Sequence, residues 1–203
     1  MIRHFPKDFI LGASTASYQI EGAIHADGRG PSIWDSFSNT PGRVFEGHTG
    51  ETACGHYNRF QEDIGLLNQL NAQAYRFSVA WPRIFPEGKG KINQAGLAFY
   101  DRIVDELLEQ HITPWACLYH WDLPQALQDI GGWCNRDIQY WFRDYALAVC
   151  EHLGDRVNHF AMLNEANVVA WLGHGEGVHA PGITDQTSML KASHHQNLAQ
   201  GLA

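Results

Sequence analysis

Residues 157–165, VNHFAMLNE, decide the fold of this chain: a strand-like apolar run ends in the amide of Asn164 and the carboxyl group of Glu165. The apolar run predicts a buried strand over residues 157–163. A carboxyl group at the end of a buried strand is placed to act as an acid near neutral pH. A structural role is also open, in which Glu165 caps the following segment or forms a surface ion pair.

Three further strand patterns precede this one and alternate with helical patterns. They occupy residues 9–14, 74–81 and 112–119. A helix is predicted over residues 55–70, and Asn93 and Asn135 are suited to start two more because asparagine is a favoured N-cap. A fourth helix begins near Thr187, and long loops are expected over residues 26–52 and 172–181. Four strand–helix units without a hairpin signal predict a parallel sheet.

The polar residues that follow the strands distinguish between two parallel folds. A doubly wound fold usually has a glycine-rich phosphate turn after its first strand, and Gly12 lacks the other glycines of that pattern. Polar residues instead recur at the C-terminal end of every strand, which is typical of a (β/α)8 barrel, because that face carries the active site. We therefore expect one domain, residues 1–203, that forms the first four βα units of a TIM-type α/β barrel. The polar residues are Gln19, Arg76, His120, Asn164 and Glu165.

Composition excludes several classes of function. The chain has 203 residues, of which 44% are hydrophobic and 18% charged, and a net charge of −8, which disfavours nucleic acid and anionic membranes as partners. Polar residues interrupt every apolar run that could span a membrane, and no signal peptide is recognised, so a cytoplasmic location is expected. The four cysteines are far apart, as expected for reduced thiols. The histidines at 174, 179, 194 and 195 lack a carboxylate at ligand spacing, so neither a metal nor another cofactor is expected.

Several motifs in register resemble glycoside hydrolase family 1, the β-glucosidase family. They are FPKDFILGASTASYQIEG at residues 5–22, YRFSVAWPRI at 75–84, YHWDLP at 119–124, GGW at 131–133 and LNE at 163–165. They follow the order and spacing of that family, and the resemblance covers essentially the whole chain. It implies the N-terminal half of the family's catalytic barrel.

The resemblance also implies roles for individual residues. Gln19 and His120 would bind hydroxyl groups of the sugar, with Trp121 alongside. Asn164 would bind the sugar 2-hydroxyl, and Glu165 matches the general acid/base of a retaining mechanism. Structural alternatives remain for these side chains: Gln19 could satisfy a loop backbone, and His120 could be a core histidine. Trp121, like the earlier Trp34, could simply be packing.

The chain departs from the family pattern at two points. Ala166 stands where the family has proline, which would restrict the backbone of Glu165. The nucleophile of the family lies in a Thr-Glu-Asn-Gly-like motif on a late strand, and nothing similar occurs here. Arg76 matches the arginine beside that nucleophile. Retaining hydrolysis needs two carboxylates about 5 Å apart, so we expect the chain to be inactive on its own.

The missing nucleophile motif and the missing strands leave several partners and functions open. A β-glucoside is the expected substrate, hydrolysed with the help of a second chain that carries the remaining strands. Alternatively, the half-barrel associates with a copy of itself, or it is a truncated product that folds poorly. Two other functions stay open: a non-catalytic half-barrel for sugar binding or assembly, and part of a 6-phospho-β-glucosidase.

Overall fold

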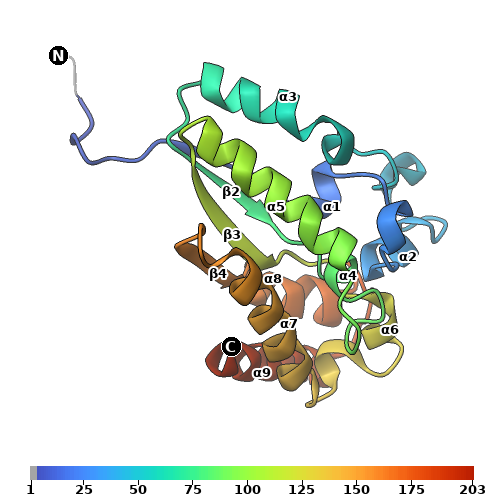
Figure 1. Cartoon of the computed structure of the whole chain (residues 1–203). Helices are drawn as coiled ribbons and strands as arrows, with labels where there is room; N and C mark the ends of the chain where they lie inside the picture. The colour runs from blue at the N-terminus through green and yellow to red at the C-terminus, as the bar shows by residue number, and fades with distance from the viewer. Residues whose placement is uncertain (1–3) are drawn as a thin grey trace.

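The computed structural model of the chain describes residues 4–203 and contains one four-stranded sheet (Figure 1). The strands are parallel and follow the order β1-β2-β3-β4. Their bounds are β1 (Gly12–Ser14), β2 (Ala74–Ser78), β3 (Thr113–Tyr119) and β4 (His159–Leu163). Each strand therefore pairs with the strand before it in the sequence. The predicted succession of four βα units is confirmed.

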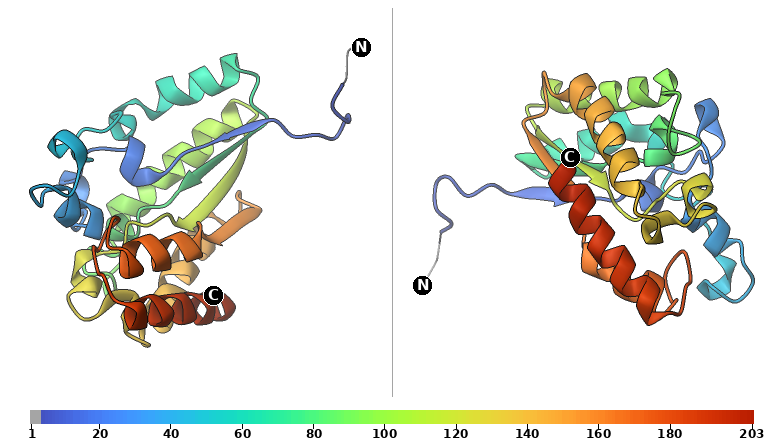
Figure 2. Two further views of the ribbon diagram at one scale, coloured as in Figure 1. Left: turned by 180° about the vertical axis from the view of Figure 1, so that it is seen from behind. Right: turned by 90° about the horizontal axis from the view of Figure 1, so that it is seen from below.

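Four long helices connect or follow the strands and lie along one side of the sheet (Figures 1 and 2). They are α3 (His56–Gln69), α5 (Gln94–Glu109), α7 (Ile138–Leu153) and α9 (Gln186–Leu202). Short helices are α1 (Ser17–Ile20), α2 (Ile33–Ser38), α4 (Trp81–Ile84), α6 (Gln125–Gln128) and α8 (Ala166–Ala170). The short helices α1, α4, α6 and α8 come soon after the ends of the strands. None of the helices within residues 4–203 combines the length and the apolar character that crossing a membrane requires.

Aromatic side chains fill the layer between the sheet and the helices. Tyr145 of α7 is fully buried, and its hydroxyl donates to the backbone carbonyls of Val79 and Leu118 at 2.9 and 2.7 Å. The ring of Trp81 stacks on Tyr145 with centroids 4.8 Å apart. Such rings bury large areas while their polar atoms keep hydrogen bonds. Much of the aromatic content of the sequence therefore serves packing.

The first and last strands differ from their predicted form. The predicted strand over residues 9–14 begins only at Gly12, and Phe9, Ile10 and Leu11 are 46%, 58% and 52% exposed. β4 was predicted to be buried, but its side chains are exposed or half-buried. The exposure of residues 9–11 and that of β4 have the same cause. Within residues 4–203, β1 pairs only with β2, and β4 only with β3.

The predicted loop over residues 26–52 contains an ordered helix. Ser32 and Asp35 form a capping box at the start of α2, since the Ser32 side chain accepts from the Asp35 N–H and the Asp35 carboxylate accepts from the Ser32 N–H. The second predicted loop, residues 172–181, begins inside a π-helical turn, η4 (Trp171–Gly175). Asn135 does not cap α7, because that helix starts at Ile138. The side-chain oxygen of Asn135 instead accepts a hydrogen bond from the N–H of Asp137.

Candidate active site

Side chains from three neighbouring strands meet in one hydrogen-bonded chain. Nη2 of Arg76, on β2, donates to Oδ1 of Asn164 at 3.0 Å. Nδ2 of Asn164, directly after β4, lies 3.0 Å from Nε2 of His120, directly after β3. The backbone N–H of Asn164 also donates to the carbonyl of Tyr119. The parallel pairing of β2, β3 and β4 brings these three predicted residues together.

The surroundings of His120 determine its protonation state and its tautomer. Burial, together with the positive charge of Arg76, lowers the pKa of His120 to about 4. The ring is therefore neutral near pH 7. Asn164 uses its oxygen to accept from Arg76, so its amide nitrogen donates to Nε2 and the proton of His120 is on Nδ1. The side-chain amide of Asn164 is thus oriented through both its oxygen and its nitrogen.

Glu165 lies at the edge of this cluster with an exposed side chain. It occupies the N-cap position of α8 with φ 47°, but its carboxylate makes no capping hydrogen bond. Nδ2 of Asn164 lies 3.4 Å from Oε2 of Glu165, and no ion pair of Glu165 occurs within residues 4–203. Neither the capping role nor the surface ion pair is therefore seen. Within residues 4–203, the contact with Asn164 is the side-chain hydrogen bond of the Glu165 carboxylate, which is otherwise exposed.

A cavity of about 260 Å³ adjoins His120 and brings Gln19, His120 and Trp121 together. Trp121 has φ 81°, and its indole N–H donates to the carbonyl of Asn164 at 2.9 Å. Trp34 also lines this cavity, so both tryptophans face it as well as pack. Aromatic walls with a few polar groups are typical of sites for small ligands.

His179 lines the same cavity and was not identified from the sequence as a site residue. Its ring lies between Trp34 and Trp121, with centroids 5.5 and 5.4 Å away. Burial lowers the pKa of His179. The contact arises because the segment after β4 folds back, with the N–H of His179 donating to the carbonyl of Leu172. Sequence spacing carries no signal for such a long-range contact.

Two of the other histidines that were weighed as metal ligands, His174 and His195, hydrogen-bond to backbone carbonyls. Nδ1 of His174 lies 3.0 Å from the carbonyl of Val169, and Nδ1 of His195 lies 2.8 Å from the carbonyl of Trp133. Both rings are buried. In the part of the chain that the structure describes, no group of three or more His, Cys, Asp or Glu side chains is placed to hold a metal ion.

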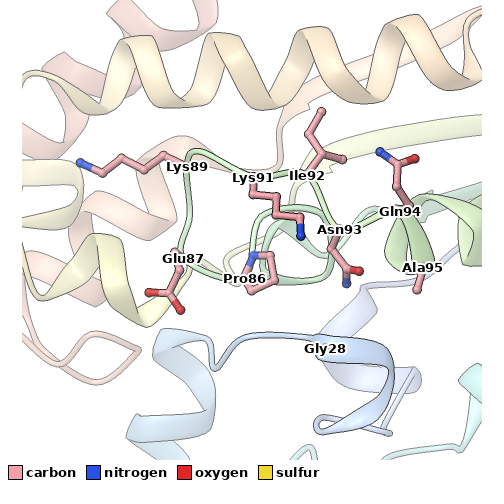
Figure 3. A pocket seen from close by; sticks show the side chains of 9 residues that line it. All are labelled: Gly28, Pro86, Glu87, Lys89, Lys91, Ile92, Asn93, Gln94 and Ala95. Atoms are coloured by element: carbon pink, nitrogen blue, oxygen red, sulfur yellow. The ribbon is translucent and has the colours of Figure 1, made fainter.

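A larger hollow of about 470 Å³ lies between Gly28 and the segment that leads into α5 (Figure 3). Lys91 and Asn93 point toward Gly28, whereas Lys89 extends away and lies over the ring of Trp141, 4.3 Å from its centroid. Asn93 uses its amide to donate to the carbonyls of Asp27 and Arg83. None of the predicted site residues lines this hollow, so its size does not mark the site.

Comparison with known proteins gives a consistent result. A family model described as glycosyl hydrolase family 1 matches residues 1–203. Beta-glucosidase A of Acetivibrio thermocellus is 54% identical over 199 residues, which are 98% of this chain and 44% of that protein. The aryl-phospho-beta-D-glucosidase BglC of Bacillus subtilis is 50% identical over 200 residues, 98% of this chain and 42% of that protein.

Solved structures agree with the sequence comparison. The family 1 β-glucosidase from Thermotoga maritima superposes with a TM-score of 0.98 at 53% identity, and the match covers 99% of this chain and 46% of that chain. This chain therefore spans less than half the length of the proteins that it matches. Its four parallel strands correspond to part of their barrel.

Proposed function

Because the chain belongs to glycosyl hydrolase family 1, we propose that it supplies the acid/base half of a retaining β-glucosidase. The observation that carries the proposal is the chain of contacts from Arg76 through Asn164 to His120, with the Glu165 carboxylate beside it. Glu165 protonates the glycosidic oxygen in the first step and deprotonates water in the second.

The other residues of the cluster hold the sugar. Gln19 and His120 bind its hydroxyl groups in the cavity that they share, and Trp121 forms a wall of that cavity. Asn164 binds the 2-hydroxyl, a contact that strengthens as positive charge develops on the ring. Arg76 has no carboxylate partner among the residues described, and in this proposal it faces the nucleophile.

The nucleophile belongs, in this proposal, to the rest of the barrel. Residues 1–203 act as one unit, and the outer edges of β1 and β4 pair with the remaining strands. The partner is a polypeptide that carries those strands. Self-association of two copies brings a second Glu165 but no nucleophile motif, so it would give no hydrolysis.

Reconstitution tests this proposal. The chain is mixed with a polypeptide that carries the remaining strands of a family 1 barrel, and hydrolysis of β-glucosides is measured. Glu165→Gln should lower turnover of alkyl glucosides about 100-fold or more, because poor leaving groups need protonation. The glycosylation step of nitrophenyl β-glucoside should be much less affected. Glu151→Gln, an exposed change on α7, is the matched control. Full activity of Glu165→Gln on alkyl glucosides would contradict the assignment.

One relative favours a second substrate class. The 50% identical Bacillus subtilis protein is an aryl-phospho-beta-D-glucosidase, so a phosphorylated glucoside is the alternative substrate. Comparing nitrophenyl β-glucoside with its 6-phosphate in the same assembly separates the two. A preference for the 6-phosphate would replace the β-glucosidase proposal.

A third reading follows from the cavity itself. Gln19, His120 and Trp121 already share one cavity in this chain, which would suit sugar binding without catalysis. Calorimetric titration of the chain with glucose, together with the hydrolysis assay of the assembly, distinguishes this role. Binding without turnover in every assembly would favour it.

A further inference from the structure

One buried hydrogen bond joins the two segments that follow β1 and β3 and carry the proposed sugar-binding residues Gln19 and His120; they are called the two loops below, although the first includes the one-turn helix α1. Oγ of Ser17 donates to Oδ2 of Asp122 at 2.6 Å. Ser17 is 3% exposed and Asp122 is fully buried. Ser17 lies two residues before Gln19, and Asp122 lies two residues after His120. The bond therefore connects the segment that carries Gln19 to the segment that carries His120, and both of these residues line the cavity.

The same pair is anchored to the sheet and to α2. The backbone N–H of Ser17 donates to Oγ of Ser78, the last residue of β2, at 2.7 Å. The carbonyl of Leu123, next to Asp122, accepts from the N–H of Ile33 at 2.8 Å. Each loop is thus also tied to a neighbouring element, and the Ser17–Asp122 bond ties the two loops to each other.

The buried position of Asp122 destabilises the folded state. Its Oδ1 is buried and has no hydrogen-bond partner among residues 4–203. Its pKa is raised to about 7, chiefly by burial and also by the charge of Glu21, although the hydrogen bond from Ser17 and the charge of Arg29 act to lower it. The other titratable groups that face it are Cys117 and Tyr119 of β3 and Tyr145 of α7. A buried, incompletely satisfied carboxyl group destabilises a protein, so packing alone does not explain it.

We propose that Asp122 is a positioning residue which, through Ser17, holds Gln19 and His120 at the separation that one sugar ring requires. The role in sugar binding rests on the proposed function, whereas the coupling of the two loops does not. Ser17→Ala would free the loops from each other without changing any residue of the cavity.

The chain offers a closely matched control. Ser32 is also fully buried and donates to a buried carboxylate, Asp35, at 2.9 Å, and Oδ1 of Asp35 likewise has no partner among the residues described. That pair lies within the capping box of α2, beside residues 123–125, and makes no hydrogen bond to residues 15–20 or to Asp122. Ser32→Ala thus removes the same kind of bond in a different place.

Amide hydrogen exchange on the 203-residue chain tests the coupling. Ser17→Ala and Asp122→Ala should raise the exchange rate about tenfold in residues 15–20 and 119–122 together, because one buried hydrogen bond is lost. Asp122→Asn keeps an oxygen for the Ser17 hydroxyl and should restore rates close to the parent. Ser32→Ala should change α2 and leave residues 15–20 as they are. Faster exchange in only one of the two loops would overturn the proposal. If Asp122→Ala fails to fold, the exchange rates of Ser17→Ala alone decide whether the two loops are coupled.

Kinetics of the reconstituted enzyme test the positioning role. Ser17→Ala should raise KM for nitrophenyl β-glucoside about tenfold and leave kcat within about twofold, because ground state and transition state lose the same contacts. Ser32→Ala should leave KM unchanged. Lower kcat with unchanged KM would indicate a structural role and overturn the proposal. A parent assembly without turnover would overturn the proposed function alone, since exchange in the chain reports the coupling independently.

Discussion

Two residues of the candidate site, Trp121 and Glu165, adopt backbone angles that side-chain-bearing residues rarely adopt. Their φ angles are 81° and 47°. Such conformations cost roughly 1–3 kcal/mol each and persist only where the surroundings hold them. The indole of Trp121 donates to the carbonyl of Asn164, and the carbonyl of Glu165 accepts from the N–H groups of Val168 and Val169. Strain is therefore located at the ends of two adjacent strands, β3 and β4, where the proposed chemistry takes place.

His120 should make the chain less stable toward acid. Its pKa is held at about 4, below the ordinary 6.5, so between these values the unfolded chain binds a proton that the folded chain does not. Stability therefore falls as pH falls through this window, by about 1–2 kcal/mol after allowance for partial exposure. Urea unfolding at pH 7 and 4.5 should show a smaller loss in His120→Asn than in the parent. The exposed His48→Asn is the control, and an identical loss in His120→Asn would contradict the expectation.

Asp122 should act in the opposite direction. Its pKa is raised from 3.8 to about 7, so between these values the folded chain binds a proton that the unfolded chain has lost. Stability therefore falls as pH rises through the window, by about 3 kcal/mol between pH 4.5 and 7.5. Relative to the parent, Asp122→Asn should gain about that much over this range in urea unfolding. The exposed Asp137→Asn should follow the parent. A constant difference between Asp122→Asn and the parent would show that Asp122 titrates normally.

At the level of elements, one arginine connects α5 to the start of β4. Arg156, in the turn after α7, donates to Asp101 and Asp105 of α5 at 2.6 Å each and to Asp155 at 3.0 Å. Nε2 of His152 on α7 lies 2.5 Å from the other oxygen of Asp101. Because β4 leads directly to Asn164 and Glu165, this cluster helps to set where the site residues lie relative to α5.

Arg156→Lys should destabilise the chain by about 1–2 kcal/mol, because lysine keeps the charge but cannot reproduce the planar fork that contacts three carboxylates. The loss should shrink in 1 M salt, since the partners are partly exposed. Urea unfolding at low and high salt measures both effects. Arg143→Lys, which affects a single exposed pair with Asp144, should stay within about 0.5 kcal/mol. Equal losses in the two variants would show that the cluster adds nothing beyond a surface pair.

The elements that were predicted well from the sequence are those whose neighbours lie within the described residues. β2 has neighbours on both edges and is mostly buried, and α5 buries a regular face, so periodicity identified both. β1 was predicted too long because apolar residues 9–11 cannot reveal that no second neighbour covers them here. The helix α2 was missed because its signal is a capping box inside a glycine-rich stretch, and its stability comes from burial against distant residues.

The candidate site was predicted in part. Gln19, His120 and Trp121 follow predicted strands, and the parallel sheet brings them to one cavity. Ser17 and Asp122 were part of recognised motifs but had no assigned role, because their bond spans residues that are far apart in the sequence. His179 was missed for the same reason. Their roles stay predictions until the variants are measured.

At the scale of the whole molecule, both outer edges of the sheet are open among the residues described. Trp115 stacks on His159 with centroids 4.3 Å apart and stays 36% exposed. Phe9, Ile10 and Leu11 extend before β1 and are exposed as well. Open edges beside apolar residues favour association with another chain.

The isolated chain should therefore self-associate at micromolar concentration, and Ile10→Lys should reduce this because a charge beside β1 opposes edge pairing. Leu190→Lys on α9 is matched in exposure, at 60% against 58% for Ile10, and should behave as the parent. Sedimentation velocity measures the difference. A monomeric parent, or equal effects of the two lysines, would contradict the expectation.

The strand order β1-β2-β3-β4 has a consequence for how the chain is made. Each strand finds its partner in a segment that the ribosome has already released, at roughly 5–20 residues per second. The bond from Ser17 to Asp122 likewise joins residues of the first and third units, so it needs nothing that follows the third unit. The nascent polypeptide can thus assemble stepwise from its beginning, with each unit serving as the template for the next.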